Sequence, residues 1–191
     1  RNHDECCMRR RAPTMADLAM RYELPTWCLW ALITGSFLAL TWYYHSLPWW
    51  LVPVLGGWLV CWHSQLQHEH LHGHPTRSAL FNGLLVAPSL TLWLPYLRYR
   101  ELHLEHHRAD PLTLPGRDTE SYYVSAERWA RLPGAARAVL WANQTLAGRL
   151  LLGPLLIELP WVAGEVRRLV RGEAGAWRCW SLHVLALLPL F

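Results

Sequence analysis

The stretch that decides the fold begins Gln67-His68-Glu69-His70-Leu71-His72-Gly73-His74 and ends Glu101-Leu102-His103-Leu104-Glu105-His106-His107-Arg108. Eight of the eleven histidines in the chain lie between His63 and His107. Neutral imidazole is a common ligand of transition metals, and few other roles require so many histidines in so short a segment. The pattern therefore indicates a metal site.

The spacing of these histidines is helical. Residues three and four apart share one face of an α-helix, and this spacing relates His68 to His72 and joins the later group of His103, His106 and His107. Two facing helical segments would offer five imidazoles, which exceeds the four ligands of a structural zinc. The count predicts two ions, or one ion with histidines to spare. The competing interpretation, a histidine-rich surface loop, is disfavoured by the helical spacing and by the apolar segments alongside.

Composition favours a membrane protein. The 191 residues suit one domain or slightly more, yet 52% are hydrophobic and thirteen are Trp. The net charge of +4 comes with eighteen arginines and no lysine. These arginines are scattered or flank apolar runs instead of forming one stripe with aromatics, which argues against nucleic acid as a partner. The five cysteines follow neither a zinc nor a disulfide spacing, and we interpret them as core residues in a reducing compartment.

Two uncharged runs precede the histidines. Residues 27–44 and 49–66 each approach the roughly 20 residues needed to cross a bilayer, and a short turn separates them. They predict a transmembrane hairpin, with a buried hairpin of a soluble protein as the alternative. Residues 1–24 are polar, and Arg9-Arg10-Arg11 place this tail in the cytoplasm by the positive-inside rule. The second run then returns to the cytoplasm and delivers His68 and His72 there.

The later apolar stretches are less regular. Residues 79–97 contain Asn82, Gly83, Pro88 and Pro95, so we expect a segment that dips into the interface and returns, leaving both histidine groups on one side. Residues 139–164 hold several polar side chains and predict an interfacial amphipathic segment. The apolar run of residues 177–191 is too short to cross the bilayer. The sequence thus predicts an all-α integral membrane protein with an N-terminal hairpin, a cytoplasmic histidine region and the start of a further transmembrane helix.

A resemblance arises from the two histidine motifs. The segment from His68 to Gly73 resembles the first histidine box, HxxxH, of membrane fatty acid desaturases, and the segment from His103 to His107 resembles their second box, HxxHH. Together with the preceding hairpin, the resemblance covers residues 27–110 well. It implies that residues 25–191 form a desaturase-like membrane domain. Alkane and carotenoid hydroxylases have similar boxes.

The resemblance implies a specific chemistry. Two non-haem iron ions would be held by imidazoles, would use O2 as co-substrate, and would receive electrons from a ferredoxin-type or cytochrome-type donor. The substrate would be a lipid acyl chain, desaturated or hydroxylated at the cytoplasmic face of the inner membrane. The implied metal ligands are His68, His72, His103, His106 and His107.

The chain departs from the family in one respect. The family has a third box, again HxxHH-like, whereas His183 is the one histidine after His107. We therefore expect a C-terminally truncated chain whose last ligands are missing, which would leave the two-iron site incomplete.

Several assignments stay open in the sequence. His70 and His74 also stand four apart, so the first pair of ligands could be shifted by two residues. Four acids could orient imidazole N–H groups or could be solvated surface residues: Glu69, Glu101, Glu105 and Asp110. We expect His45 and His63 at the membrane edge, away from the metal.

Two other functions compete with the desaturase. The segment from His68 to His72 also fits HExxH, the zinc protease motif in which Glu69 would be the general base. That motif is short, no convincing third zinc ligand follows, and the second histidine group would have no role. An inactive remnant that retains two boxes is the remaining alternative.

Overall fold

The computed structural model describes residues 14–110, 112, 114–121 and 123–188, so Arg9-Arg10-Arg11 lie outside the described part. Every regular element in the described part is a helix, as the all-α prediction requires. The chain divides into two compact units, Arg1–Val86 and Ala87–Phe191. Each unit contains one of the two histidine groups.

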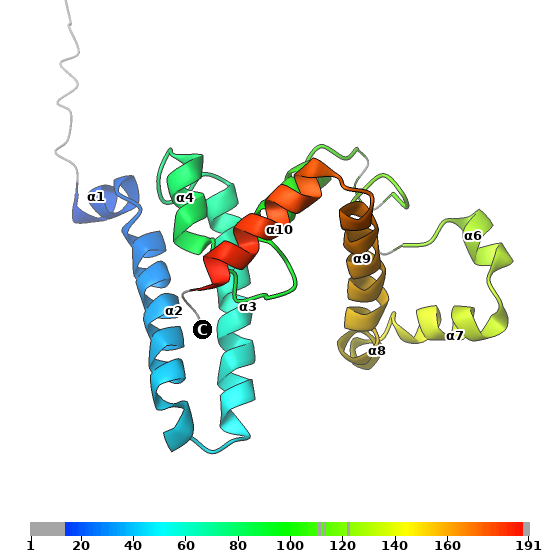
Figure 1. Ribbon diagram of the computed structural model, residues 1–191, viewed down its shortest axis with the longest axis horizontal. Coiled ribbons are helices and arrows are strands. Elements are labelled where there is room, and N and C mark those ends of the chain that lie inside the picture. Colours follow the sequence, from blue (N-terminus) through cyan, green and yellow to red (C-terminus); the bar gives the residue numbers. More distant parts are fainter. Residues whose placement is uncertain (1–13, 111, 113, 122, 189–191) are drawn as a thin grey trace, which may run out of the picture. The chain divides into compact units, whose positions relative to one another are not determined.

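The first unit contains a helical hairpin (Figure 1). Its elements are α1 (Met15–Arg21), α2 (Leu24–Tyr43), the 3-10 turn η1 (Tyr44–Ser46), α3 (Leu51–Leu71) and α4 (Ala79–Val86). The hydroxyl of Thr14 caps α1 by accepting from the Asp17 amide, while the Asp17 carboxylate accepts from the Thr14 amide. Glu23 adopts a left-handed conformation (φ 56°) between α1 and α2, and Pro25 lies in the first turn of α2, where no amide donor is needed.

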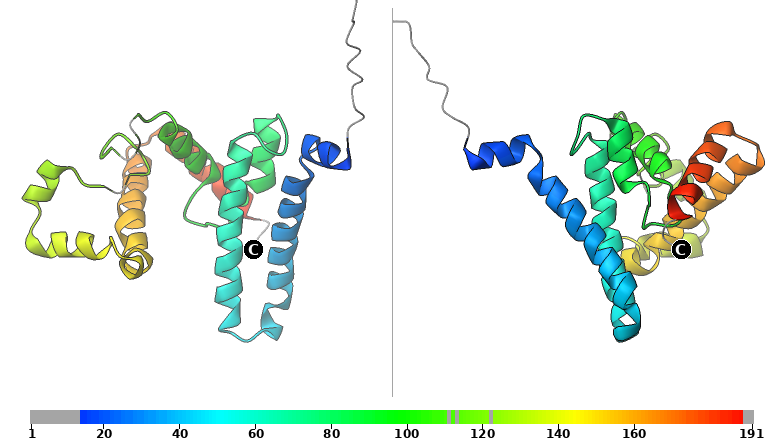
Figure 2. Two further views of the ribbon diagram at one scale, coloured as in Figure 1. Left: turned by 180° about the vertical axis from the view of Figure 1, so that it is seen from behind. Right: turned by 60° about the vertical axis from the view of Figure 1, so that its left-hand side comes forward.

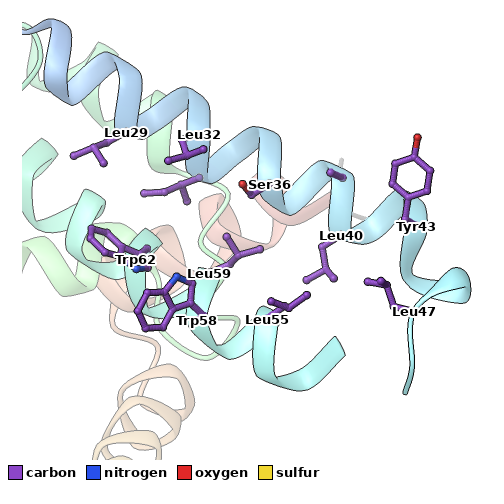
Figure 3. Close-up of a pocket in the computed structure, with 12 residues that line it drawn as sticks. Leu29, Leu32, Ser36, Leu40, Tyr43, Leu47, Leu55, Trp58, Leu59 and Trp62 are labelled. Carbon is purple, nitrogen blue, oxygen red and sulfur yellow. The ribbon is translucent and has the colours of Figure 1, made fainter. Parts of the chain in front are cut away.

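The two long helices of the hairpin, α2 and α3, lie side by side when seen from the front and from behind (Figures 1 and 2). Between them is an apolar groove of about 680 Å³, lined mainly by leucine and tryptophan side chains (Figure 3). Large apolar side chains outside the groove are also exposed, and Trp42 and Trp49 are 81% and 83% exposed. Such a surface suits contact with lipid, because soluble proteins rarely expose apolar patches of this extent.

Side-chain hydrogen bonds hold α4 against the hairpin. The buried Gln67 side chain on α3 donates to the Val86 carbonyl over 3.1 Å, and the Trp30 indole on α2 donates to the Leu85 carbonyl over 2.9 Å. Asn82 is fully buried and binds Thr76 through both side-chain atoms. The polar Asn82, which suggested a broken segment, thus anchors the loop between the first histidine group and α4.

The second unit contains six helices among its described residues. They are α5 (Tyr96–His106), α6 (Ala126–Arg131), α7 (Gly134–Ala142), α8 (Leu146–Leu151), α9 (Gly153–Val170) and α10 (Ala174–Leu187). Helix α10 packs on both α5 and α9. The α9–α10 turn is closed by the Trp177 indole, which donates to the Leu169 carbonyl over 3.0 Å. This packing holds the helix that bears the second histidine group.

By length and composition alone, two described segments could cross a membrane: Leu24–Ser46 and Leu146–Val170. The first agrees with the predicted span of residues 27–44. Helix α3 is 21 residues long but is not among the two, because its second half carries the polar side chains of the histidine group. Residues 139–164 were expected to lie at the membrane interface. The candidate segment Leu146–Val170 overlaps them, because its few charges leave its mean hydropathy at 1.4.

Candidate metal centre

The first histidine group lies at the C-terminal end of α3. His68 and His72 stand one helical turn apart, and their ring centroids are 4.6 Å from each other. His72 caps the helix, and Gly73 then takes a positive φ of 98° that ends it. The helical spacing predicted from the sequence therefore does place these two imidazoles together.

The other histidines of this unit have different surroundings. His70 is 1% exposed; its Nδ1 donates to the Leu66 carbonyl over 2.8 Å, and its Nε2 has no hydrogen-bond partner among the described residues. Burial lowers the pKa of His70, which keeps the ring neutral. His74 instead lies 3.2 Å from the carboxylate of Glu23. His45 is exposed in η1, stacked on Tyr44.

The second histidine group lies on the last turns of α5 in the second unit. Their ring centroids are separated by 4.6 Å for His103 and His107, 5.8 Å for His103 and His106, and 5.6 Å for His106 and His107. The Nε2 atoms of His103 and His107 are 3.0 Å apart. The i, i+3, i+4 spacing therefore gathers three imidazoles on one face.

A three-residue segment that follows α5 binds back onto it. The Asp118 carboxylate accepts from His106 Nδ1 and the Glu120 carboxylate accepts from His103 Nδ1, each over 2.7 Å. Between them, the Thr119 hydroxyl donates to the Leu102 carbonyl over 2.8 Å. We call this segment, Asp118–Glu120, the carboxylate clamp. Because ionised carboxylates only accept, each bound Nδ1 carries the proton and leaves Nε2 as the coordinating nitrogen of a neutral ring.

The clamp also sets the electrostatics of the second group. The hydrogen bond to Asp118, supported by the charge of Glu120, raises the pKa of His106 above its usual range. Burial, aided by the nearby Glu120 carboxylate, raises the pKa of Tyr99 to about 12, so this phenol stays protonated. The ring of Tyr99 lies 5.7 Å from that of His103. The site thus combines carboxylate-bound imidazoles with a neutral aromatic neighbour.

The donor set fits a transition metal. Metal-bound histidines commonly give their other ring N–H to a carboxylate or a backbone carbonyl, which is the arrangement of His103 and His106. Two nitrogens that each lie about 2.1 Å from one ion are roughly 3 Å apart, and His103 and His107 match that separation. Each unit contributes two candidate metal ligands: His68 and His72 in the first unit, and His103 and His107 in the second.

The acids singled out in the sequence are not the ones that bind the imidazoles of α5. Glu101 pairs with Arg98, Glu69 lies 3.5 Å from His68, and Glu105 and Asp110 are exposed. Asp118 and Glu120 were not among the acids that the sequence indicated. The distance of 12 to 17 residues between each acid and its histidine carries no helical periodicity that could have indicated the pairing.

A family model described as “Fatty acid desaturase” matches residues 44–191, which contain both histidine groups and the carboxylate clamp. No curated protein and no solved structure matches the chain.

Proposed function

We propose that this chain, which belongs to the fatty acid desaturase family, uses O2 at a histidine-held pair of iron ions to desaturate or hydroxylate a lipid acyl chain. Membership of the family implies an oxidoreductase. The observation that carries the proposal is the carboxylate-bound arrangement of imidazoles on α5, inside the region that matches the family. Carboxylates that hold Nδ1 leave Nε2 for a metal, which is what a non-haem iron enzyme needs.

The proposed iron ligands are two histidines of α3 and its cap and three of α5: His68, His72, His103, His106 and His107. The bound metal would supply the oxidation of an unactivated C–H bond, for which no amino-acid side chain suffices. The protein's own residues hold the imidazoles in place: Asp118 and Glu120 fix the Nδ1 protons of His106 and His103. Thr119 keeps the clamp seated on α5.

The apolar groove between α2 and α3 supports a lipid substrate. It is bordered by residues such as Leu32, Leu40 and Trp58, with Ser36 as a polar exception (Figure 3). An acyl chain bound against these side chains would be shielded from water and stabilised by about 0.8 kcal/mol for each buried methylene. We place the acyl chain of the substrate in this groove.

The proposed setting is the inner membrane, with residues 25–191 as the membrane domain and residues 1–24 as a cytoplasmic tail. Arg98, Arg100 and Arg108 flank the second histidine group, and basic residues prefer the cytoplasmic side. The metal ligands would then face the cytoplasm, where a ferredoxin-type or cytochrome-type donor could deliver electrons.

The test is product formation in membranes that contain the chain, assayed by mass spectrometry of the lipid acyl chains. His72→Ala and His106→Ala should each abolish a new double bond or hydroxyl group while the protein still inserts. His45→Ala is the matched control, because His45 is exposed in η1, and it should leave the product unchanged. Full activity in either ligand variant would contradict the proposal.

A second variant separates this chemistry from the zinc protease alternative. Glu69 would be the general base of a protease, so Glu69→Gln should abolish peptide hydrolysis if that alternative holds. In a desaturase, Glu69 is an exposed neighbour of His68, and we expect Glu69→Gln to retain most of the lipid product.

A further inference from the structure

A buried carboxylate in the second unit is not explained by the proposed chemistry alone. Glu165 on α9 is 3% exposed and belongs to the segment Leu146–Val170, one of the two candidate membrane spans. An ionised side chain in such a segment is costly unless it is paired, and it usually has a functional role. Its surroundings therefore indicate what the carboxylate does.

Both carboxylate oxygens of Glu165 are hydrogen-bonded. Oε1 accepts from Arg98 Nε over 2.9 Å and from Arg168 Nη1 over 2.9 Å, while Oε2 accepts from Trp180 Nε1 over 3.1 Å. The donors come from three different helices: Arg98 from α5, Arg168 from α9 and Trp180 from α10. Glu165 is thus the point at which these helices are joined by directional bonds.

Each arginine is also held at a second place. Arg98 Nη1 pairs with Glu101 on α5, and Arg168 Nε donates to Glu173, the N-cap residue of α10, over 2.8 Å. A guanidinium held by two carboxylates has little freedom to turn, since its donors form a rigid planar fork. The position of Arg98, and with it the first half of α5, is therefore tied to Glu165.

Helix α5 is the element that presents the second histidine group. Arg98 lies five residues before His103, about 7.5 Å along the helix axis at 1.5 Å per residue. The carboxylate clamp secures the other half of the helix through His103, Leu102 and His106. The two attachments together fix the tilt and rotation of α5, whereas the clamp alone holds only the end that carries the histidines.

We propose that Glu165 is a positioning residue for the metal site: it holds α5 so that His103, His106 and His107 converge. The inference rests on the proposed function, because it requires these imidazoles to bind metal. A buried ion pair is weak support for stability as such, because apolar groups of similar volume often serve as well. Directional bonds from α9 to the two other helices, α5 and α10, provide orientation, and a displacement of about 1 Å in a site can cost 100-fold in activity.

The experiment compares Glu165→Gln with Glu173→Gln in the purified full chain. Glu173 is the matched control, because it also binds Arg168 but is 40% exposed and stands at the N-cap of α10. The probe is Co²⁺ alone, whose visible absorption reports the ligand geometry, together with thermal unfolding of the metal-free protein. We expect Glu173→Gln to bind Co²⁺ like the wild type, and Glu165→Gln to bind at least tenfold more weakly with a changed spectrum.

Further variants keep the test decisive if Glu165→Gln does not fold. Trp180→Phe removes one donor to Glu165, and Arg98→Lys keeps the charge but loses the Nε donor; both should weaken Co²⁺ binding and alter the spectrum. Wild-type affinity and spectrum in the variants that fold, with only a lower melting temperature, would overturn the positioning role and leave the proposed function standing. Absence of Co²⁺ binding by the wild type would overturn the proposed function, and this inference with it.

Discussion

Asp118 and Glu120 determine which nitrogen each of two histidines can offer to a metal. The carboxylates accept hydrogen bonds from the Nδ1–H groups of His106 and His103 over 2.7 Å, and neutral rings bound in this way have their lone pair at Nε2. The identity of the coordinating atom is thus set by residues that would not touch the metal. Two experiments at the residue scale follow from this arrangement.

Asp118→Asn should weaken metal binding without unfolding the chain. The asparagine keeps the size of the side chain but can turn an N–H toward Nδ1, so it no longer fixes the proton there. Loss of such an acceptor typically lowers metal affinity about 10- to 100-fold. Competition against a chelator measures the change, and Asp110→Asn, at an exposed acid, is the control. Equal affinities of the two variants would contradict the role of the clamp.

The metal-free protein should lose stability as the pH rises above about 6.5, the ordinary pKa of histidine. The pKa of His106 is raised in the folded chain, chiefly by the hydrogen bond to Asp118. A raised folded-state pKa gives stability that is fully present below the unfolded-state pKa and is lost as the pH passes through the folded-state value. Thermal unfolding in the presence of chelator, from pH 5.5 to 9, measures this.

Asp118→Asn is the comparison for this titration, because it removes the charge and the bond that raise the pKa. Its melting temperature should depend less on pH than that of the wild type. The same pH dependence in both proteins would show that His106 is not the group responsible.

The grouping of the histidines could be predicted from the sequence, but the carboxylates that bind them could not. Helical spacing is a local property, so the grouping of His103 with His106 and His107 followed from the sequence. The partners Asp118 and Glu120 lie in an irregular segment whose path back to α5 depends on turn geometry and on Thr119. Such non-local pairings have no periodicity that a sequence displays.

At the scale of elements, the end of α3 gives alternate histidines different surroundings. The rings of His68 and His72 lie close together near its end, whereas His70 is buried and its Nε2 has no hydrogen-bond partner in the part of the chain that the structure describes. The sequence alone left the pairs His68–His72 and His70–His74 both open. The contact of His74 with the Glu23 carboxylate and the 4.6 Å separation of the His68 and His72 rings favour the first pair.

His70→Leu should retain metal and should melt at the same temperature as the wild type or higher. The substitution replaces a buried ring that has an unpaired nitrogen with an apolar side chain, which removes a desolvation cost. Thermal unfolding and elemental analysis measure both effects, with His72→Ala as the variant that should lose metal. Loss of metal from His70→Leu would instead assign the ligand role to His70.

Two glycines in the second unit should respond to alanine in opposite directions. A Cβ at Gly148 would lie 1.9 Å from the Ala142 carbonyl oxygen, so Gly148→Ala must displace α8 from the end of α7 and should cost about 1–3 kcal/mol. Gly164 lies inside α9 with open space around its Cβ position, and Gly164→Ala should stabilise by about 0.5–1 kcal/mol. Thermal unfolding in detergent compares the two. A stabilising Gly148→Ala would contradict the close approach of α8 to α7.

At the scale of the whole molecule, amino-acid composition predicted the fold class better than the pattern of individual segments predicted which of them are candidate membrane spans. The abundance of Trp and apolar residues indicated apolar helices, and every regular element in the described part of the chain is a helix. The predicted span of residues 27–44 lies within the candidate segment Leu24–Ser46, whereas the candidate segment Leu146–Val170 overlaps residues 139–164, which the sequence pattern assigned to the interface. The reason is that polar residues such as Arg149 and Glu158 suggest an interfacial helix, whereas the average hydropathy of the segment remains high.

Metal content of the purified chain tests the central claim most directly. Elemental analysis of the wild type beside His72→Ala and His106→Ala should find iron in excess over zinc in the wild type, and loss of that iron in both variants. The reason is that each variant removes a proposed iron ligand. Zinc bound in place of iron, and retained in His106→Ala, would contradict the account, because it would place the metal on the first group alone.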